Sequence, residues 1–281
     1  MRRFFLEAFL FLSVLVSADP LPVGNFSLPF SQQIGPLVSF GENIVDQGQV
    51  IVYLGADAFI GNDRYSTDVI PSVVYGIRDD LSLFLQVPLA PGNKQGEAHS
   101  AGFEDMSLQL EYMFYDGVTT SSSIQATLVA NVTFPTGSST KIPPTGFGST
   151  SFFLGSTLNY TTEQWFVFTS PGAILTTSNG GTQFGDAVLY QFGFARDFPS
   201  PFGWIFAWMV EFDGQYAWKN IIKGKTDPNS GGNVIYVTPS LWASSKRFIL
   251  QLGVGYPIVQ HLFGNQPKQW VLFDFNFGVT F

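Results

Sequence analysis

The chain has 281 residues, no cysteine and a formal net charge of −8, and only 12% of its residues are charged, against ~25% in a typical soluble domain. The acidic balance argues against a nucleic-acid partner, because such proteins carry a basic patch, and without cysteine there is no disulfide framework. Aromatic residues reach 16% and mean hydropathy is +0.18, which favours a membrane protein. After the amino-terminal stretch no segment offers the ~20 apolar residues of a spanning helix, so a closed β-barrel is the structure that remains.

Residues 1–18 have the pattern of a secretory signal peptide. A basic start, Met1-Arg2-Arg3, precedes an apolar run from Ala8 to Val16 and a small-residue exit at Val16-Ser17-Ala18. Glu7 is unusual so close to the apolar run, which leaves a signal anchor or a mitochondrial presequence as alternatives. We expect export, with the mature protein beginning near Asp19.

Residues 19–47 form a second predicted unit ahead of the barrel. They are rich in Pro, Gly and Asn and have no sustained period, yet they carry the large apolar residues Phe26, Phe30, Ile34, Leu37, Val38 and Phe40. The segment is either a periplasmic tail or a plug-like piece held in the barrel mouth, and the sequence leaves both open.

Residues 48–281 alternate between apolar and polar positions in segments of the length that a tilted spanning strand needs. We count about twelve, with a range of about 10–14: Gln49–Ile60, Asp68–Ile77, Leu81–Ala90, Asp105–Tyr115, Ser123–Phe134, Ser151–Tyr160, Gln164–Thr176, Phe184–Arg196, Trp204–Trp218, Asn233–Trp242, Arg247–Tyr256 and Lys268–Phe281. The weakest is Gln164–Thr176, where Phe166 and Phe168 fall opposite Trp165 and Val167. The prediction is an all-β, transmembrane, antiparallel up-and-down barrel.

The connections between these segments are alternately short and long. Short ones include residues 78–80 and 161–163, and long ones include residues 91–102, 135–148, 220–232 and 257–267. This is typical of short periplasmic turns and longer extracellular loops, and it places both termini in the periplasm. Trp residues fall near strand ends, where interfacial aromatic belts are expected: Trp165, Trp204, Trp218, Trp242 and Trp270.

The last strand has one face of aromatic and aliphatic residues and one mostly polar face. Phe273, Phe275, Phe277 and Phe281 lie on the apolar face, which we expect to contact lipid. A carboxy-terminal Phe that closes such a strand is a common ending of bacterial outer-membrane barrels. We expect these four residues to act as the assembly signal for the barrel-assembly machinery.

Short motifs of structural residues recur along the predicted barrel: Tyr75-Gly76, Gln86-Val87-Pro88, Gly102 with Asp105, Phe134-Pro135-Thr136-Gly137 with Gly146, and Pro239. In these motifs the chain resembles the MetA-pathway of phenol degradation family of outer-membrane proteins, from about Asp68 to the end. The resemblance implies an outer-membrane barrel that transports small aromatic or hydrophobic compounds. It implies no catalytic residue.

The residues themselves offer no catalytic, cofactor-binding or metal site. The two histidines, His99 and His261, fall in predicted outer loops, and the chain has no Gly-x-Ser-x-Gly elbow. Residues 227–238 have Thr238 at the twelfth place, where a calcium loop requires a Glu. We therefore expect no enzyme and no cofactor.

Polar residues on the predicted inner face are the candidate lumen lining: Asp105, Gln109, Glu111, Asn131, Glu211, Asp213, Gln251, Asp274 and Asn276. They either bias the charge preference of a path or fill the interior with hydrogen bonds. Gly253, Gly255 and Gly278 are expected to leave room between them. The favoured function is an outer-membrane channel for small hydrophobic or aromatic solutes, and the alternative is a structural or surface-interaction barrel with a filled lumen and no transport.

Overall fold

The computed structural model describes residues 28–29, 32–41, 43–198, 200 and 203–281. The expected signal peptide, residues 1–18, and the first part of the 19–47 segment lie outside the described residues. No helix in the described ranges is long and apolar enough to cross a membrane.

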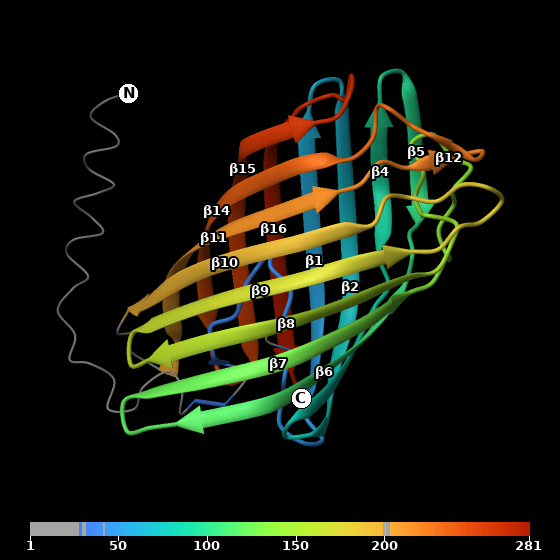
Figure 1. Ribbon diagram of the computed structural model, residues 1–281. Coiled ribbons are helices and arrows are strands. Elements are labelled where there is room, and N and C mark those ends of the chain that lie inside the picture. The colour runs from blue at the N-terminus through green and yellow to red at the C-terminus, as the bar shows by residue number, and fades with distance from the viewer. Residues whose placement is uncertain (1–27, 30–31, 42, 199, 201–202) are drawn as a thin grey trace, which may run out of the picture.

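The described strands form one large antiparallel sheet and one small hairpin (Figure 1). Their bounds are β1 (Val50–Gly61), β2 (Arg64–Arg78), β3 (Leu81–Gln86), β4 (Leu89–Gln95), β5 (Ala98–Phe103), β6 (Ser107–Val118), β7 (Ser122–Thr133), β8 (Ser151–Thr162), β9 (Trp165–Thr176), β10 (Ala187–Phe198), β11 (Ile205–Ala217), β12 (Ile221–Ile222), β13 (Lys225–Thr226), β14 (Gly232–Ser244), β15 (Phe248–Leu262) and β16 (Gln269–Thr280).

The large sheet closes on itself into a barrel. β1 pairs with β2 on one side and with β16 on the other, and the order around the ring continues β15, β14, β11, β10, β9, β8, β7, β6, β3 and back to β2. Twelve strands of the described chain make this ring, while β4 and β5 extend it as a hairpin beside β2. The predicted up-and-down antiparallel barrel is confirmed.

The two ends of the barrel differ in their connections. At what we call the short-turn end the strands join through residues 79–80, 119–121, 163–164 and 245–247, and at the long-loop end through residues 134–150, 177–186 and 218–231. The β1–β2 turn departs from this rule, because residues 62–63 alone join two strands at the long-loop end. The predicted strands Gln49–Ile60 and Asp68–Ile77 leave residues 61–67 as a loop, but β2 begins at Arg64 and includes residues 64–67.

The segment predicted as one strand over Leu81–Ala90 is interrupted. β3 pairs with one half of β2 and β4 with the other, and the break falls at Val87-Pro88, where proline has no N–H to donate to the ladder. The long loop expected over residues 91–102 is also wrong, because β4 and β5 form a hairpin there. Asp105 consequently lies between β5 and β6 rather than at the start of a strand.

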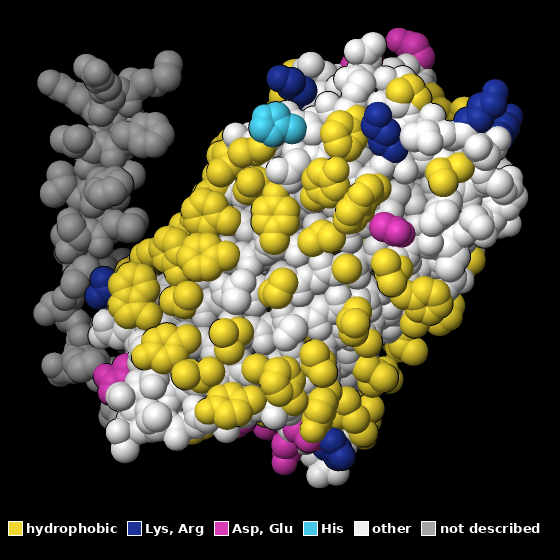
Figure 2. Space-filling model, viewed as in Figure 1, with side chains coloured by type: hydrophobic (Ala, Val, Ile, Leu, Met, Phe, Trp, Pro, Cys, Tyr) yellow, Lys and Arg dark blue, Asp and Glu magenta, His cyan; other side chains and the backbone are white. Residues whose placement is uncertain are grey.

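Large apolar side chains cover the outer wall, and most charged groups gather toward its ends (Figure 2). Leu128, Phe152, Leu154, Leu241 and Phe273 are each exposed on this surface. Trp165, Trp218 and Trp270 are exposed near strand ends, as an interfacial belt requires.

Three aromatic side chains, Trp242, Phe166 and Phe168, point into the barrel. Trp242 is 6% exposed and points into the barrel, where it joins a cluster of buried residues that includes Phe166 and Phe168. The prediction that Trp242 belongs to the interfacial aromatic belt is therefore wrong. Strand Gln164–Thr176 alternated weakly because its inward face carries these two phenylalanines, so both of its faces are apolar.

Candidate functional site

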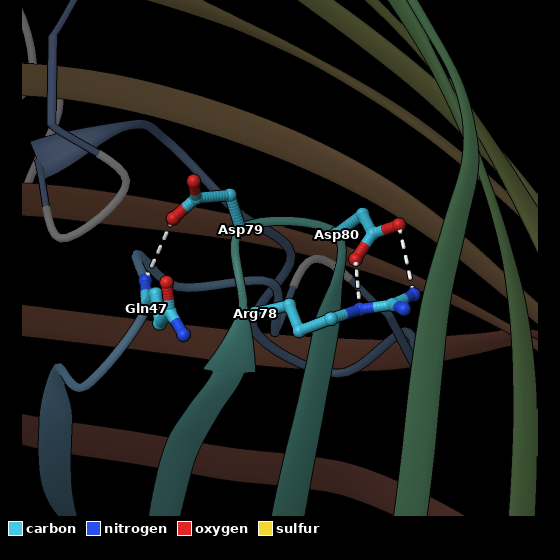
Figure 3. Close-up of polar contacts among 4 residues, drawn as sticks. All are labelled: Gln47, Arg78, Asp79 and Asp80. Atoms are coloured by element: carbon cyan, nitrogen blue, oxygen red, sulfur yellow. Dashed lines mark hydrogen bonds and ion pairs between the residues drawn. The ribbon is translucent and has the colours of Figure 1, made fainter.

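Residues 32–41 and 43–47, which we call the lumen segment, lie inside the barrel. Near the start, the Gln32 carbonyl oxygen accepts a hydrogen bond from the Ser244 hydroxyl at 3.1 Å, at the short-turn end of β14. At the other end the Gln47 N–H donates to the Asp79 carboxylate at 2.8 Å, in the β2–β3 turn (Figure 3). Both ends therefore lie at the same mouth, and the chain between them rises into the lumen and returns.

The β2–β3 turn that receives the segment is itself braced by an ion pair. The Arg78 guanidinium binds the Asp80 carboxylate through two nitrogens, at 2.8 and 3.0 Å (Figure 3). Gly76, just before this turn, exchanges backbone hydrogen bonds with Gly48 and Gln49. A Cβ at Gly76 would lie 2.7 Å from the Val45 carbonyl oxygen, so only glycine lets the segment pass this close.

The deepest part of the segment is held by one carboxylate of the wall. Glu211, which is fully buried on β11, accepts the backbone N–H groups of Leu37, Val38 and Ser39 at 2.9, 3.2 and 3.0 Å. Hydrogen bonds to an ionised acceptor are about twice as strong as neutral ones. Glu211 thus compensates for its own burial by satisfying three backbone donors that have no strand partner.

Neighbouring wall residues extend this anchor. The Ser39 hydroxyl donates to Asp213 at 2.6 Å, and the Phe40 N–H donates to the Gln191 side-chain oxygen at 3.1 Å. Gln191 also donates to Asp213 at 3.4 Å. The segment therefore has hydrogen bonds to both β10 and β11.

Two further wall residues grip the segment on either side of this point. On β15, Gln251 donates to the Gly35 carbonyl oxygen at 3.0 Å and accepts from Asn276 of β16 at 3.0 Å. On β6, Glu111 accepts the Asn43 N–H at 3.2 Å. The segment is thus fixed to opposite sides of the ring.

Apolar contacts fill the space that small wall residues leave. The Phe40 ring packs edge-on against Phe153 at 4.6 Å between centroids, and Leu37 lies where a Cβ at Gly253 would come within 2.6 Å of its methyl group. The expectation that Gly253 leaves open room is therefore wrong, because Leu37 occupies that room.

A cavity of about 340 Å³ remains between the lumen segment and the wall formed by β1–β3 and β14–β16. Its apolar lining includes Phe59, Phe84, Trp242 and Phe275, and its polar lining includes Asp57, Ser72, Gln251, Asp274 and Asn276. No Lys or Arg is among the described residues that line it. The Trp242 indole N–H is buried and has no hydrogen-bond partner in the described chain, so a donor is available beside the cavity.

The predicted lumen residues have different roles. The lumen segment is held directly by Glu111, Glu211, Asp213 and Gln251. The cavity is lined by Asp274 and Asn276, and Gln109 pairs with Asn131 across β6 and β7. Asp105 has another role: its carboxylate accepts the Gly137 and Phe147 N–H groups at 2.8 and 2.6 Å and clamps the 134–150 loop.

Sequence reasoning missed the backbone of residues 37–39 and the side chain of Asp57. Asp57 faces Asp274 across β1 and β16 and shares the cavity with it. The strand pattern could have shown that Asp57 faces inward. It lies two residues from both Gly55 and Phe59, which line the same cavity, and alternate residues of a strand share a face.

Comparison with known proteins supports the fold. No known family profile and no curated protein matches the sequence. The barrel is similar to an outer membrane channel from Pseudomonas putida F1, with 16% identity, 88% of this chain and 100% of that chain covered, and a TM-score of 0.70. At that identity the likeness shows the fold alone.

Two more distant likenesses are a NanC porin, at 10% identity and a TM-score of 0.46 over 82% of this chain and 98% of that one, and the CymD monoaromatic hydrocarbon channel, at 10% identity and a TM-score of 0.40 over 94% and 99%. At these scores neither carries an argument about function.

Proposed function

We propose that the protein is an outer-membrane channel that passes small hydrophobic or aromatic solutes along a lumen narrowed by the lumen segment. The observation that carries the proposal is the cavity beside the lumen segment, where aromatic side chains and a few polar groups lie together inside a closed barrel. Ligand sites are usually of this kind, mostly apolar with a small number of polar groups. The free Trp242 N–H would suit a solute with one hydrogen-bond acceptor.

The orientation follows from the two ends of the barrel. Outer-membrane barrels have short periplasmic turns and longer external loops, so we place the short-turn end, with both ends of the lumen segment, in the periplasm. The outward apolar band would contact lipid, and Phe273, Phe275, Phe277 and Phe281 would present the last strand to the barrel-assembly machinery. The motifs shared with the MetA-pathway family are consistent with this assignment.

The charge of the interior predicts the selectivity of any ionic leak. The buried charged side chains of the described residues are all acids, Asp105, Glu111, Asp197, Glu211 and Asp213. Carboxylates facing a confined path attract cations more strongly than they would in bulk water. The leak should therefore prefer cations.

A planar-bilayer recording tests the proposal. The full-length barrel should show a small, cation-preferring conductance that rises when residues 19–47 are removed, and liposomes that carry it should take up small aromatics faster than empty ones. Silent bilayers for both forms, together with unchanged uptake, would contradict a channel.

The second candidate is a structural barrel with a filled lumen. The observation that favours it is the packing of Leu37 into the space over Gly253 and the hydrogen bonds of Glu211 to the segment, which leave no wide path. The same recording separates the two, because a structural barrel should stay closed until the segment is removed and should not speed aromatic uptake.

A further inference from the structure

A cluster of aromatic rings and lysines stands at the long-loop end of β11 and β15. Its aromatic part is Tyr216, Trp218 and Phe263, with Lys219 at the Phe263 ring, and Lys223 and Lys225 follow in the same 218–231 loop. We call these six residues the lysine–aromatic patch. Tyr216 packs edge-on against Trp218 at 5.1 Å and against Phe263 at 6.3 Å between ring centroids. The Lys219 ammonium lies 5.2 Å from the centroid of the Phe263 ring, within the range of a cation–π contact.

The aromatic part of the patch faces away from the lumen. Glu211 and Asp213 of β11 point inward to the lumen segment, so Tyr216, an odd number of residues further on, belongs to the outward face. Trp218 beyond the strand is 49% exposed, and Ile221 and Ile222 of β12 are 39% and 45% exposed. The patch therefore joins the apolar outer wall to the loops above it, at the level where aromatic residues meet lipid headgroups.

The three lysines are exposed and free of carboxylate partners. Within the described chain the ion pairs are Arg78–Asp80 and Lys94–Asp63, and neither involves the patch. The carboxylate of Asp227, close by in sequence, accepts the Asn229 N–H at 2.9 Å, and that of Asp186 accepts the Thr176 N–H at 2.8 Å. Figure 2 shows Lys and Arg side chains at the end of the barrel where Figure 1 places β4, β5 and β12.

The β12–β13 hairpin carries Lys223 in its turn and Lys225 at the start of β13. Lys223 and Gly224 both have positive φ, 53° and 74°, the conformation of a tight two-residue hairpin in which Asn-Gly is favoured over most residues. Gly224 donates its N–H to the Gly181 carbonyl oxygen at 2.9 Å, which ties the hairpin to the 177–186 loop. Lys223 is therefore exposed on a turn whose backbone is tied to a neighbouring loop.

We propose that the lysine–aromatic patch binds a phosphorylated lipid of the leaflet at the long-loop end, with the ammonium groups on its phosphates and the aromatic rings against its chains or sugar. The inference rests on the membrane location in the proposed function and adds a lipid ligand to it. A lipid is favoured over a free anion because Lys219 contacts a ring of the outward aromatic surface and the other two lysines lie in the loop that continues from it. It is favoured over a protein partner because this surface is continuous with the lipid-facing wall.

The test measures binding of the detergent-solubilised full-length protein to lipid A, a glycolipid with two phosphates, against phosphatidylcholine. The variant Lys223→Asn/Lys225→Gln removes two charges and suits the turn. The control Lys246→Gln/Arg247→Gln removes two charges from exposed residues at the short-turn end. A basic residue near an anionic membrane surface contributes about a fivefold effect, so the first variant should weaken lipid A binding about 20-fold and the control should not.

The outcomes distinguish a lipid ligand from free phosphate, and they test the lipid site separately from the proposed channel. An unchanged affinity of the hairpin variant, an equal loss in the control, or displacement of lipid A by millimolar inorganic phosphate would each overturn the lipid assignment. Both variants should keep their resistance to dodecyl sulfate before boiling, which shows that the barrel is intact. Because binding is measured in detergent, a silent bilayer recording would reject the channel and leave this result standing.

Discussion

Ser39 and Glu211 lie 172 positions apart in the chain, yet the Ser39 N–H donates to the Glu211 carboxylate at 3.0 Å in the middle of the barrel. Leu37 and Val38 donate to the same carboxylate. One wall residue therefore holds three consecutive peptide groups of the lumen segment. The position of the segment depends on the charge and shape of that one side chain.

Glu211→Gln should loosen the lumen segment. The amide nitrogen of Gln cannot accept an N–H, so at least one charge-assisted hydrogen bond is lost, at a cost of about 1.5–3 kcal/mol. The amide protons of residues 37–39 should then exchange with solvent roughly ten- to a hundredfold faster, and conductance should rise toward that of the form without residues 19–47.

The matched control is Glu163→Gln, the same chemical change at an exposed position in the β8–β9 turn. It should leave exchange and conductance unchanged. Equal behaviour of the two variants would show that Glu211 does not anchor the segment.

Gly76→Ala should disturb the exit of the lumen segment. The added Cβ would meet the backbone carbonyl oxygens of Val45 and Asp46, which cannot rotate away. The backbone hydrogen bonds of Gly76 with Gly48 and Gln49 would be strained. We expect a higher conductance, read in the planar bilayer. Gly92→Ala in β4, which also pairs with β2, is the control, because the nearest atom to its Cβ would lie 3.7 Å away, and it should behave like the unmodified protein. In a form without residues 19–47, Gly76→Ala should have little effect.

Asp105→Asn should release the 134–150 loop. The amide oxygen is neutral and accepts an N–H group more weakly than a carboxylate does. The amide nitrogen takes the place of the other oxygen, and as a donor it cannot accept the N–H group of Gly137 or Phe147 that it faces. Protease added to intact cells should cut this loop several times faster than in the unmodified protein. Asp227→Asn, in the 218–231 loop, removes the same charge at a distance and should not change cleavage of the 134–150 loop.

The last strand should be essential for assembly. Phe281 exchanges backbone hydrogen bonds with Val50 at 2.9 and 3.4 Å, and β16 closes the ring against β1. Deleting residues 273–281 would leave an open edge in lipid, which is not tolerated, so the protein should not accumulate in the outer membrane. Phe281→Asp should reduce accumulation, and Asn276→Ala, on the inner face, should be far milder. Normal levels of the deletion form would refute the assembly role.

The wall of the barrel could be predicted because its physics is local. Alternation in the chain indicates which residues face outward, and it placed a predicted segment on each of the twelve ring strands. Three bounds were wrong: β2 begins earlier than predicted, β15 ends later, and Leu81–Ala90 joins β3 to the start of β4. The miss at residues 91–102 has a local cause: Gly92, Gly96 and polar neighbours resemble a loop, but they form a hairpin that pairs beside β2. Exposed hairpins lack the apolar face that marks a spanning strand.

The interior could be predicted only in part, because its contacts join distant positions. Glu211 and Asp213 were recognised as inward-facing by parity, but nothing near them in sequence indicates that they bind residues 37–39. Trp242 looked like a belt residue because it lies near a strand end, but Leu241 beside it is exposed on the outer wall, so alternation turns Trp242 inward. Irregular segments without a period carry no such signal.

The course of the lumen segment also determines how it could ever be removed. Because Gln32 and Gln47 lie at the same mouth, the chain between them enters the barrel as a loop and leaves by the same end. It does not pass through to the other end. Such a loop is topologically unlinked from the ring, so it can leave once its hydrogen bonds and its apolar contacts with the wall are broken. The β1–β16 seam can stay sealed throughout, and the barrier to opening is set by side chains such as Glu211 and never by the integrity of the wall.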